Sequence, residues 1–290
     1  MKIRKILPFI FTAMISGSMS YSVNAEEYCD TLKYTIKDKS VVITGYSGSP
    51  KVLEIPSEID GRKVVQIREN AFYKCESLER VVLPDTVEFV GHHAFFECTA
   101  LESITVSDGV CSIGEGCFSG CINLSEVELS DSIRLIDDKS FFNCISLNKI
   151  EMPSSVEEIG DYAFSGTAVE TVGFSGKLLN IGEGAFLNCE SMGRVYIPES
   201  VINIGSCAFG YNGVPARQNH DFRISGTEKS LGRKYAETNG FDYENINEEK
   251  SMGKISLIPA LGVVFSGAGL LFFNMINKIR SFKRKYEYEC

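Results

Sequence analysis

The chain repeats itself with a fixed period of 23 residues. Phenylalanines recur at that spacing through the middle of the sequence, and one interval, between Phe164 and Phe186, is 22 residues. They stand at Phe72, Phe95, Phe118, Phe141, Phe164, Phe186 and Phe209. Such a period is typical of a solenoid, in which stacked units bury a continuous core that no single unit could bury alone. The two domains that 290 residues would suggest are therefore not expected.

Other apolar positions keep step with the phenylalanines. An Ile or Val stands five residues before each of them, at Ile67, Val90, Ile113, Ile136, Ile159, Ile181 and Ile204. Further along each repeat, two apolar residues flank an outward position, as Val81 and Leu83 do. This period of two predicts one short parallel strand per repeat with its apolar side inward. We expect a β-rich, right-handed solenoid whose stacking is disturbed at Thr167, where one residue is missing, and at residues 211–221.

The repeat has a recognisable relative. The stretch from Ser146 to Phe164, SLNKIEMPSSVEEIGDYAF, resembles the BspA-type (Treponema pallidum-like) leucine-rich repeats of bacterial surface proteins. The resemblance implies a leucine-rich-repeat solenoid with an N-terminal cap at residues 26–66, repeats at 67–222 and a C-terminal cap at 223–250. It also implies a bacterial cell-surface protein that binds or adheres and is not an enzyme.

The two ends of the chain read differently from the middle. Residues 1–25 have a basic start, a ten-residue apolar run and a small-residue end, which is typical of a secretory signal peptide and too short for a membrane span. Residues 255–277 carry no formal charge over 23 residues, enough for a transmembrane helix. The basic tail at 278–290 predicts a cytoplasmic C-terminus. We expect a single-pass membrane protein with an extracellular N-terminal part.

Two alternatives remain for the C-terminal segment. It could be a buried core helix, although its glycines and the basic cluster beside it favour a membrane span. It also resembles a sortase signal at Ile258 to Gly262, with Leu261 where that motif has Thr, which would make the chain a wall-attached protein.

Charge limits the partners. The whole chain has a net charge of −9, and the part from Glu26 to Lys254, with 21 basic and 36 acidic residues, has −15. We therefore expect no nucleic-acid partner. No Lys or Arg stands between Arg80 and Arg134, where nine carboxylates occur: Asp85, Glu88, Glu97, Glu102, Asp108, Glu115, Glu126, Glu128 and Asp131. This acidic band could steer a basic partner, collect divalent cations or keep the surface soluble.

Cysteine and histidine offer little chemistry. Five cysteines share one column, three residues after the Phe, at Cys75, Cys98, Cys121, Cys144 and Cys189. Equivalent side chains in stacked units point the same way, so we expect free thiols packed in the core, with disulfide pairing and metal binding as alternatives. His92 and His93 are expected to face solvent from a loop. We find no activated nucleophile or acid–base pair, and expect no enzyme activity, metal or cofactor.

Two surfaces are candidates for ligand contact. The first is the outward column of the predicted strands: Val82, Thr105, Glu128, Glu151 and Tyr196, with Gly173 in the same column. The second is a ridge of apolar residues that follow the Phe: Tyr73, Phe96, Phe142 and Leu187. An exposed apolar ridge would mark an interaction site, whereas half-buried residues there would only pack the turn. The hypothesis is a binding or adhesion module for an extracellular protein or glycan; the alternative is a structural envelope protein without a ligand.

Overall fold

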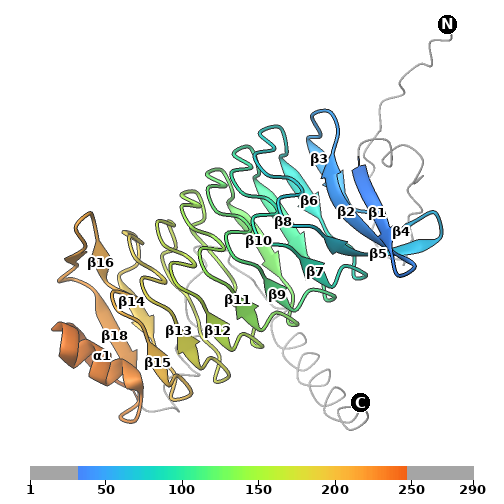
Figure 1. The fold of residues 1–290 in the computed structure, drawn as a ribbon. Coiled ribbons are helices and arrows are strands. Elements are labelled where there is room, and N and C mark those ends of the chain that lie inside the picture. Colours follow the sequence, from blue (N-terminus) through green and yellow to red (C-terminus); the bar gives the residue numbers. More distant parts are fainter. Residues whose placement is uncertain (1–31, 247–290) are drawn as a thin grey trace, which may run out of the picture. The chain divides into compact units, whose positions relative to one another are not determined.

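The structure is a computed structural model that describes residues 32–246. These residues form a solenoid whose coils follow one another in chain order, from β1 to α1 (Figure 1). The predicted signal peptide (1–25), transmembrane helix (255–277) and cytoplasmic tail (278–290) lie outside the described residues. From residue 32 to 246, no helix is long and apolar enough to cross a membrane.

Each regular coil contains two short strands, not the single strand that the sequence predicted. The first lies where the apolar alternation placed it in β6 (Arg80–Val82), β8 (Ser103–Val106) and β10 (Glu126–Leu129). These strands pair in parallel in sheet 1, which starts with β3 (Val52–Glu54), a strand that the alternation did not predict. The second consists of the recurring Ile and the residue before it. Two residues are too few to show an alternation, which explains why the sequence did not reveal this strand.

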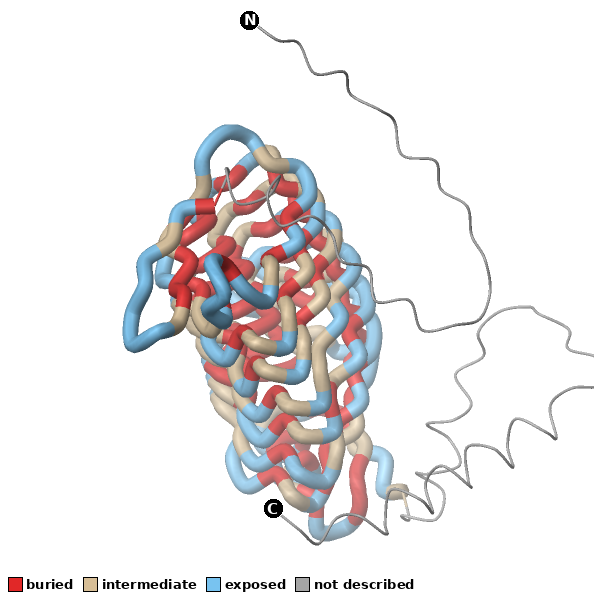
Figure 2. The backbone as a smooth tube through the Cα atoms, turned by 90° about the vertical axis from the view of Figure 1, so that its right-hand side faces the viewer, coloured by how far each residue is buried: buried red, intermediate tan, exposed pale blue. Residues whose placement is uncertain are grey.

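The second strands form their own parallel ladder, sheet 2. Its members are β9 (Ser112–Ile113), β11 (Leu135–Ile136), β12 (Glu158–Ile159), β13 (Asn180–Ile181) and β15 (Asn203–Ile204). In each, the Ile faces the core and the residue before it faces outward. The equivalent strand β7 (Phe89–Val90) pairs instead with β5 (Arg62–Ile67). Figure 2 shows the result, with buried and exposed residues recurring from one coil to the next.

The recurring phenylalanines form one stack through the core. Successive rings from Phe72 to Phe209 lie 5.0–5.4 Å apart between centroids, and each side chain is at most 1% exposed. The disturbance predicted at Thr167, where one residue is missing, does not affect the ring stack, because Phe164 and Phe186 remain 5.1 Å apart. The missing residue therefore shortens a part of the coil other than the Phe turn.

The turn that carries each Phe is also bonded to the next coil. The N–H of Phe141 donates to the carbonyl of Ala163, and the N–H of Phe164 donates to the carbonyl of Ala185, both at 2.8 Å. The turn bends through left-handed backbone positions in every coil, including Lys139 at φ 54° and Tyr162 at φ 57°. These bonds continue without a break from Phe72 to the coil of Ala208.

The column cysteines complete the core. Cys98, Cys121, Cys144 and Cys189 each donate Sγ–H to the Phe carbonyl of the preceding coil, over 3.1–3.2 Å. All the described cysteines are free thiols, and those of the column are buried, as expected. Burial raises the pKa of Cys98 to about 12 and that of Cys189 to about 11. These thiols therefore stay protonated and serve as small core residues with one hydrogen bond each.

The strand ladders, unlike the Phe turn, are interrupted. Sheet 1 ends at β10, and the next two coils have no strand at residues 149–152 and 172–174. Along this side of the described coils, one backbone hydrogen bond joins them, from Glu170 N–H to Asn148 C=O. Pairing resumes in a sheet of β14 (Arg194–Tyr196), β18 (Arg223–Gly226) and β19 (Asp242–Asn245). The one-residue deletion at Thr167 lies within this interrupted stretch.

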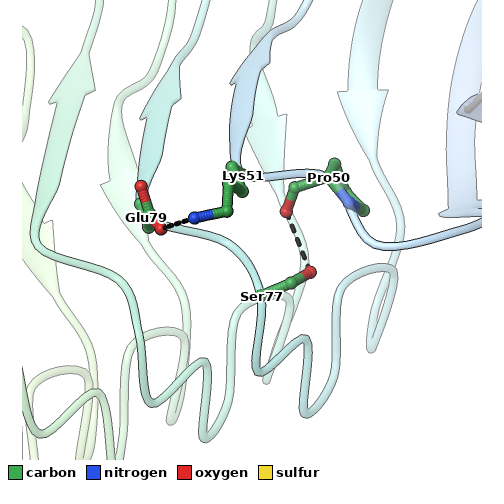
Figure 3. A network of polar contacts seen from close by, with 4 residues as sticks. All are labelled: Pro50, Lys51, Ser77 and Glu79. Atoms are coloured by element: carbon green, nitrogen blue, oxygen red, sulfur yellow. Dashed lines mark hydrogen bonds and ion pairs between the residues drawn. The ribbon is translucent and has the colours of Figure 1, made fainter.

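The N-terminal part is a mixed sheet that is tied to the first repeat, because β2 (Ser40–Tyr46) pairs with β5 in parallel. Strand β1 (Leu32–Lys37) is antiparallel to β2, and β4 (Glu58–Ile59) is antiparallel to β5. Tyr46 places its ring 5.7 Å from Phe72 and so begins the aromatic stack. Two side-chain contacts fix the connection, from Lys51 Nζ to Glu79 Oε1 at 2.7 Å and from Ser77 Oγ to the Pro50 carbonyl at 2.9 Å (Figure 3).

The C-terminal part ends the stack with a hairpin and a helix. Strands β16 (Tyr211–Asn212) and β17 (Arg217–Gln218) form the hairpin. The rings of Phe209 before it and Phe222 after it are 6.4 Å apart, wider than in the regular coils, as expected for the irregular segment at 211–221. Helix α1 (Leu231–Asn239) starts at Ser230, whose Oγ accepts from Gly232 N–H and donates to the Ile197 carbonyl. The Tyr235 hydroxyl donates to the Phe209 carbonyl at 3.1 Å, which attaches the helix to the last coil.

Candidate functional site

The predicted strand face is an outward column in the structure. Val82, Thr105 and Tyr196 are half-buried on their strands, whereas Glu128 and Glu151 are exposed. Val82, Thr105 and Glu128 align across sheet 1, because β6, β8 and β10 pair in register. Glu151 and Gly173 belong to the coils without strands, and Tyr196 belongs to the sheet beyond them. The column is therefore continuous in sequence but crosses the interruption of the ladder.

A groove lies at the start of this interruption. It has a volume of about 360 Å³ and is lined by β10, by Ser125 before it, and by Lys149 and Glu151 of the next coil. Three carboxylates, those of Glu126, Glu128 and Glu151, border it with a single ammonium. Because β10 lacks a paired strand on this side, its backbone edge also borders the groove.

The groove side chains are held in place by neighbours. The Thr105 hydroxyl donates to Glu128 Oε2 at 3.0 Å. Lys149 Nζ lies 2.7 Å from Glu151 Oε1, and this hydrogen bond lowers the pKa of the Glu151 carboxyl. Both partners are well exposed, so the pair orients the side chains without adding much stability. The groove keeps a net negative charge.

The predicted apolar ridge is not a continuous surface. Tyr73 is 43% exposed and stacks on Phe96 at 5.0 Å, whereas Phe96, Phe142 and Leu187 are half-buried. Buried Ser119 and Ser165 occupy the same column between them. Small polar residues thus break the ridge, and its members other than Tyr73 are half-buried at the turn.

The acidic band is distributed over several sides of the coil. Glu126 and Glu128 reach the groove, while others, such as Asp85 and Asp131, stand at turns. In residues 32–246, no group of three or more His, Cys, Asp or Glu side chains is placed to hold a metal ion.

The prediction that both histidines face solvent is confirmed for His92 and wrong for His93. His92 is exposed, and its Nδ1 accepts a hydrogen bond from Glu115 N–H at 3.1 Å. His93 is half-buried at φ 55°, with its ring 5.5 Å from Phe96. It packs over Gly116, where a Cβ would lie 2.6 Å from the imidazole. His93 is therefore part of the turn and not of a loop surface.

A second hollow was not found from the sequence. It has a volume of about 510 Å³ and lies where sheet 2 begins, beside Phe89, which is 63% exposed. Its lining also includes Gln66, Arg68, His92 and Asp137. Phe89 is the one aromatic residue in the outward column of the second strands, among Gln66, Ser112, Leu135, Glu158, Asn180 and Asn203. That substitution pattern is the signal that would have revealed the hollow, had the second strand been recognised.

A profile described as the BspA type leucine rich repeat region matches six copies, over residues 65–192 and 113–215. The chain belongs to this family. No curated protein matches the chain.

Solved structures of other leucine-rich repeat proteins have the same fold. A leucine rich cell surface protein from Faecalibacterium prausnitzii is 26% identical with a TM-score of 0.60, and the match covers 74% of this chain and 56% of that one. A leucine-rich repeat protein from Bacteroides ovatus is 22% identical with a TM-score of 0.54, covering 70% of this chain and 68% of that one. The chain thus spans little more than half of the F. prausnitzii protein. The family prediction made from the repeat columns is confirmed.

Proposed function

We propose that this BspA-type repeat protein acts at a bacterial cell surface as a binding module, and that its strand face holds an extracellular protein or glycan. The cell-surface part is supported by the F. prausnitzii protein, which is described as a leucine rich cell surface protein. The predicted signal peptide and membrane helix agree with that location. Because a repeat scaffold carries many different ligands, the site and not the fold must support the binding role.

The observation that carries the proposal is the groove beside β10. Its carboxylates, at Glu126, Glu128 and Glu151, are exposed and are not needed by the core. One ammonium, that of Lys149, balances only part of their charge. A ligand segment with Lys or Arg side chains would therefore gain charge-assisted hydrogen bonds in the groove. Among the proposed ligands, a basic segment of a protein fits this face best.

The backbone supplies a second element of recognition. Strand β10 has peptide groups on the side that faces the groove, since its ladder ends there. Such peptide groups bond water until a ligand with donors and acceptors replaces it. The carboxylates of the groove can therefore bind basic side chains of a segment, while its peptide groups form hydrogen bonds with the main chain of that segment.

The test compares three forms of the full-length chain. The first is unchanged, the second carries Glu126→Gln, Glu128→Gln and Glu151→Gln, and the third carries the same change of charge away from the groove, at Glu157, Glu158 and Glu190. Each is coupled to beads and incubated with extracts of host matrix and of bacterial surfaces at about 0.05 and 0.3 M salt. We expect the unchanged chain and the control to retain the same proteins, and the groove variant to lose them. Higher salt should weaken retention.

Two results would contradict the proposal. If the unchanged chain retains nothing, the chain is better described as a structural envelope protein without a ligand. If the groove variant and the control retain the same proteins equally, ligand binding does not use the strand face.

A further inference from the structure

We infer that the hollow beside Phe89 is a second binding site, for a neutral, pyranose-containing glycan. This goes beyond the proposed function, since the hollow belongs to the side of the second strands and takes a different class of ligand from the acidic groove. Its volume of about 510 Å³ falls within the range of small-ligand sites. It draws residues from four successive coils, those of β5, β7, β9 and β11, which adjoin one another in Figure 1.

The hollow exists because sheet 2 does not continue through it. Gly91 N–H bonds to the Ile67 carbonyl on one side, and Asp137 N–H bonds to the Ile113 carbonyl on the other, both at 2.9 Å. The equivalent bond between Gly114 and Val90 is missing among the described coils. The two coils are therefore less tightly paired at the surface, although a Cβ on Gly114 would still lie 3.1 Å from the Val90 carbonyl oxygen and their phenylalanines stay stacked below.

Phe89 supplies an apolar platform. Its ring is 63% exposed beside the hollow, although a Phe gains most by burial and its column is otherwise mainly polar. The face of an aromatic ring carries negative charge density, which attracts the polarised C–H groups on the flat side of a sugar ring. An exposed ring at the edge of a polar hollow is thus suited to a pyranose.

The rest of the lining suits hydroxyl groups. A sugar hydroxyl both donates and accepts, and the hollow offers donors from Arg68 and Gln66 and acceptors from Glu69 and Asp137. His92 adds a donor, because its Nδ1 accepts from Glu115 N–H and the neutral ring then carries its proton on Nε2. The mixed lining matches a polyol better than a purely apolar ligand.

The charge and rigidity of the hollow further restrict the class of ligand. Two carboxylates face one guanidinium, so a sulfated or sialylated glycan would be repelled and a neutral one preferred. The floor is backbone: a Cβ on Gly91 would lie 2.4 Å from the Glu69 nitrogen. Because the coils of β5 and β7 meet so closely, this side of the site is formed before the ligand arrives, which lowers the entropy cost of binding.

The test uses the full-length chain on immobilised neutral oligosaccharides of glucose, galactose, mannose and N-acetylglucosamine, beside sulfated and sialylated ones. We expect binding to at least one neutral set, about tenfold weaker binding for Phe89→Ala and binding within about threefold for Phe89→Tyr, which keeps the platform. Ile202→Ala, which removes another exposed apolar side chain of the second-strand region, is the matched control and should bind as the unchanged chain does. Thermal unfolding verifies that each variant is folded.

Four results would contradict the inference. No binding to any neutral glycan, equal binding by Phe89→Ala, or tighter binding to the anionic glycans overturns the inference. So does competition at this site by a basic peptide and by no sugar. The variant Glu126→Gln with Glu128→Gln should bind glycan as the unchanged chain does. The glycan assay therefore tests this inference independently of the groove proposal.

Discussion

The Phe turn and the strand ladders are built from the same repeat but respond differently to irregularity. The turn keeps ring stacking and backbone bonds in every coil from Phe72 to Phe209, even across the 22-residue repeat. The ladders break twice, after β7 and after β10, and a hollow lies at each break. The difference indicates that side-chain stacking at the turn holds the coils together. The strands are then free to separate and form surface sites.

The largest expected effect tests the role of the stack. Phe118→Ala removes a fully buried ring between two stacked neighbours and should lower the free energy of unfolding by about 3–5 kcal/mol. Phe142→Ala, in the half-buried adjoining column, is the control and should cost less than half as much. Urea denaturation measures both. Equal losses would mean that the stack has no special role.

The next prediction compares paired and unpaired strand positions in one column. Thr105→Pro places a proline in β8, which pairs on both sides, and should cost about 3 kcal/mol or more. Gly173→Pro stands in the interrupted stretch, where a Cβ would have nothing within 4 Å, and should cost less than about 1 kcal/mol. Urea denaturation is again the measurement. If the two prolines cost the same, the break in the ladder does not weaken the requirement for a strand.

The buried thiols predict a dependence of stability on alkaline pH. Burial raises the pKa of Cys98 to about 12 and of Cys189 to about 11, whereas an unfolded thiol has a pKa of about 8.5. Between these values the unfolded chain releases protons that the folded chain keeps. Stability is therefore full below about pH 8.5 and falls as pH rises, by about 1.4 kcal/mol per unit for each thiol.

Urea unfolding at pH 8, 9 and 10 measures this slope. Cys189→Thr, which copies the Thr167 found naturally in the column, should give a shallower slope than the unchanged chain. Cys111→Thr, which removes an exposed thiol, is the matched control. Identical slopes for the two variants would show that the buried column does not set the alkaline limit.

The smallest expected effect concerns the bend of the turn. Lys139 is exposed and holds φ at 54°, a conformation that costs a side chain about 1–2 kcal/mol and glycine almost nothing. Glycine loses more backbone entropy on folding than lysine does, and this loss offsets part of the gain. The net effect of Lys139→Gly should therefore be to stabilise the chain by about 0.5–1 kcal/mol. Lys234→Gly, inside helix α1, should destabilise it by about 1 kcal/mol. Thermal unfolding distinguishes the two signs.

The parts that could be predicted from sequence are those set by one residue type in every unit. The Phe and Ile columns recur over about 140 residues, so their burial follows from spacing, and the residues between them carry the resemblance to the repeat family. The breaks in the ladders could not be predicted, because they depend on how two backbones approach across 23 residues and not on a single side chain. The hollow beside Phe89 was missed for that reason. The position of His93 was predicted wrongly because the left-handed turn position that it occupies holds a different residue type in most coils, so the residue type gives no signal of the turn.

The two ends of the solenoid differ from its middle because an end coil has a neighbouring coil on one side only. A stack of identical coils has an open edge at each end, and such edges join other chains into fibres. Here Tyr235 and helix α1 lie against the last coil, and the outermost N-terminal strand, β1, carries exposed Lys33 and Lys37. Within residues 32–246, lysine charge at one end and a covering helix at the other therefore disfavour the end-to-end addition of a neighbouring coil.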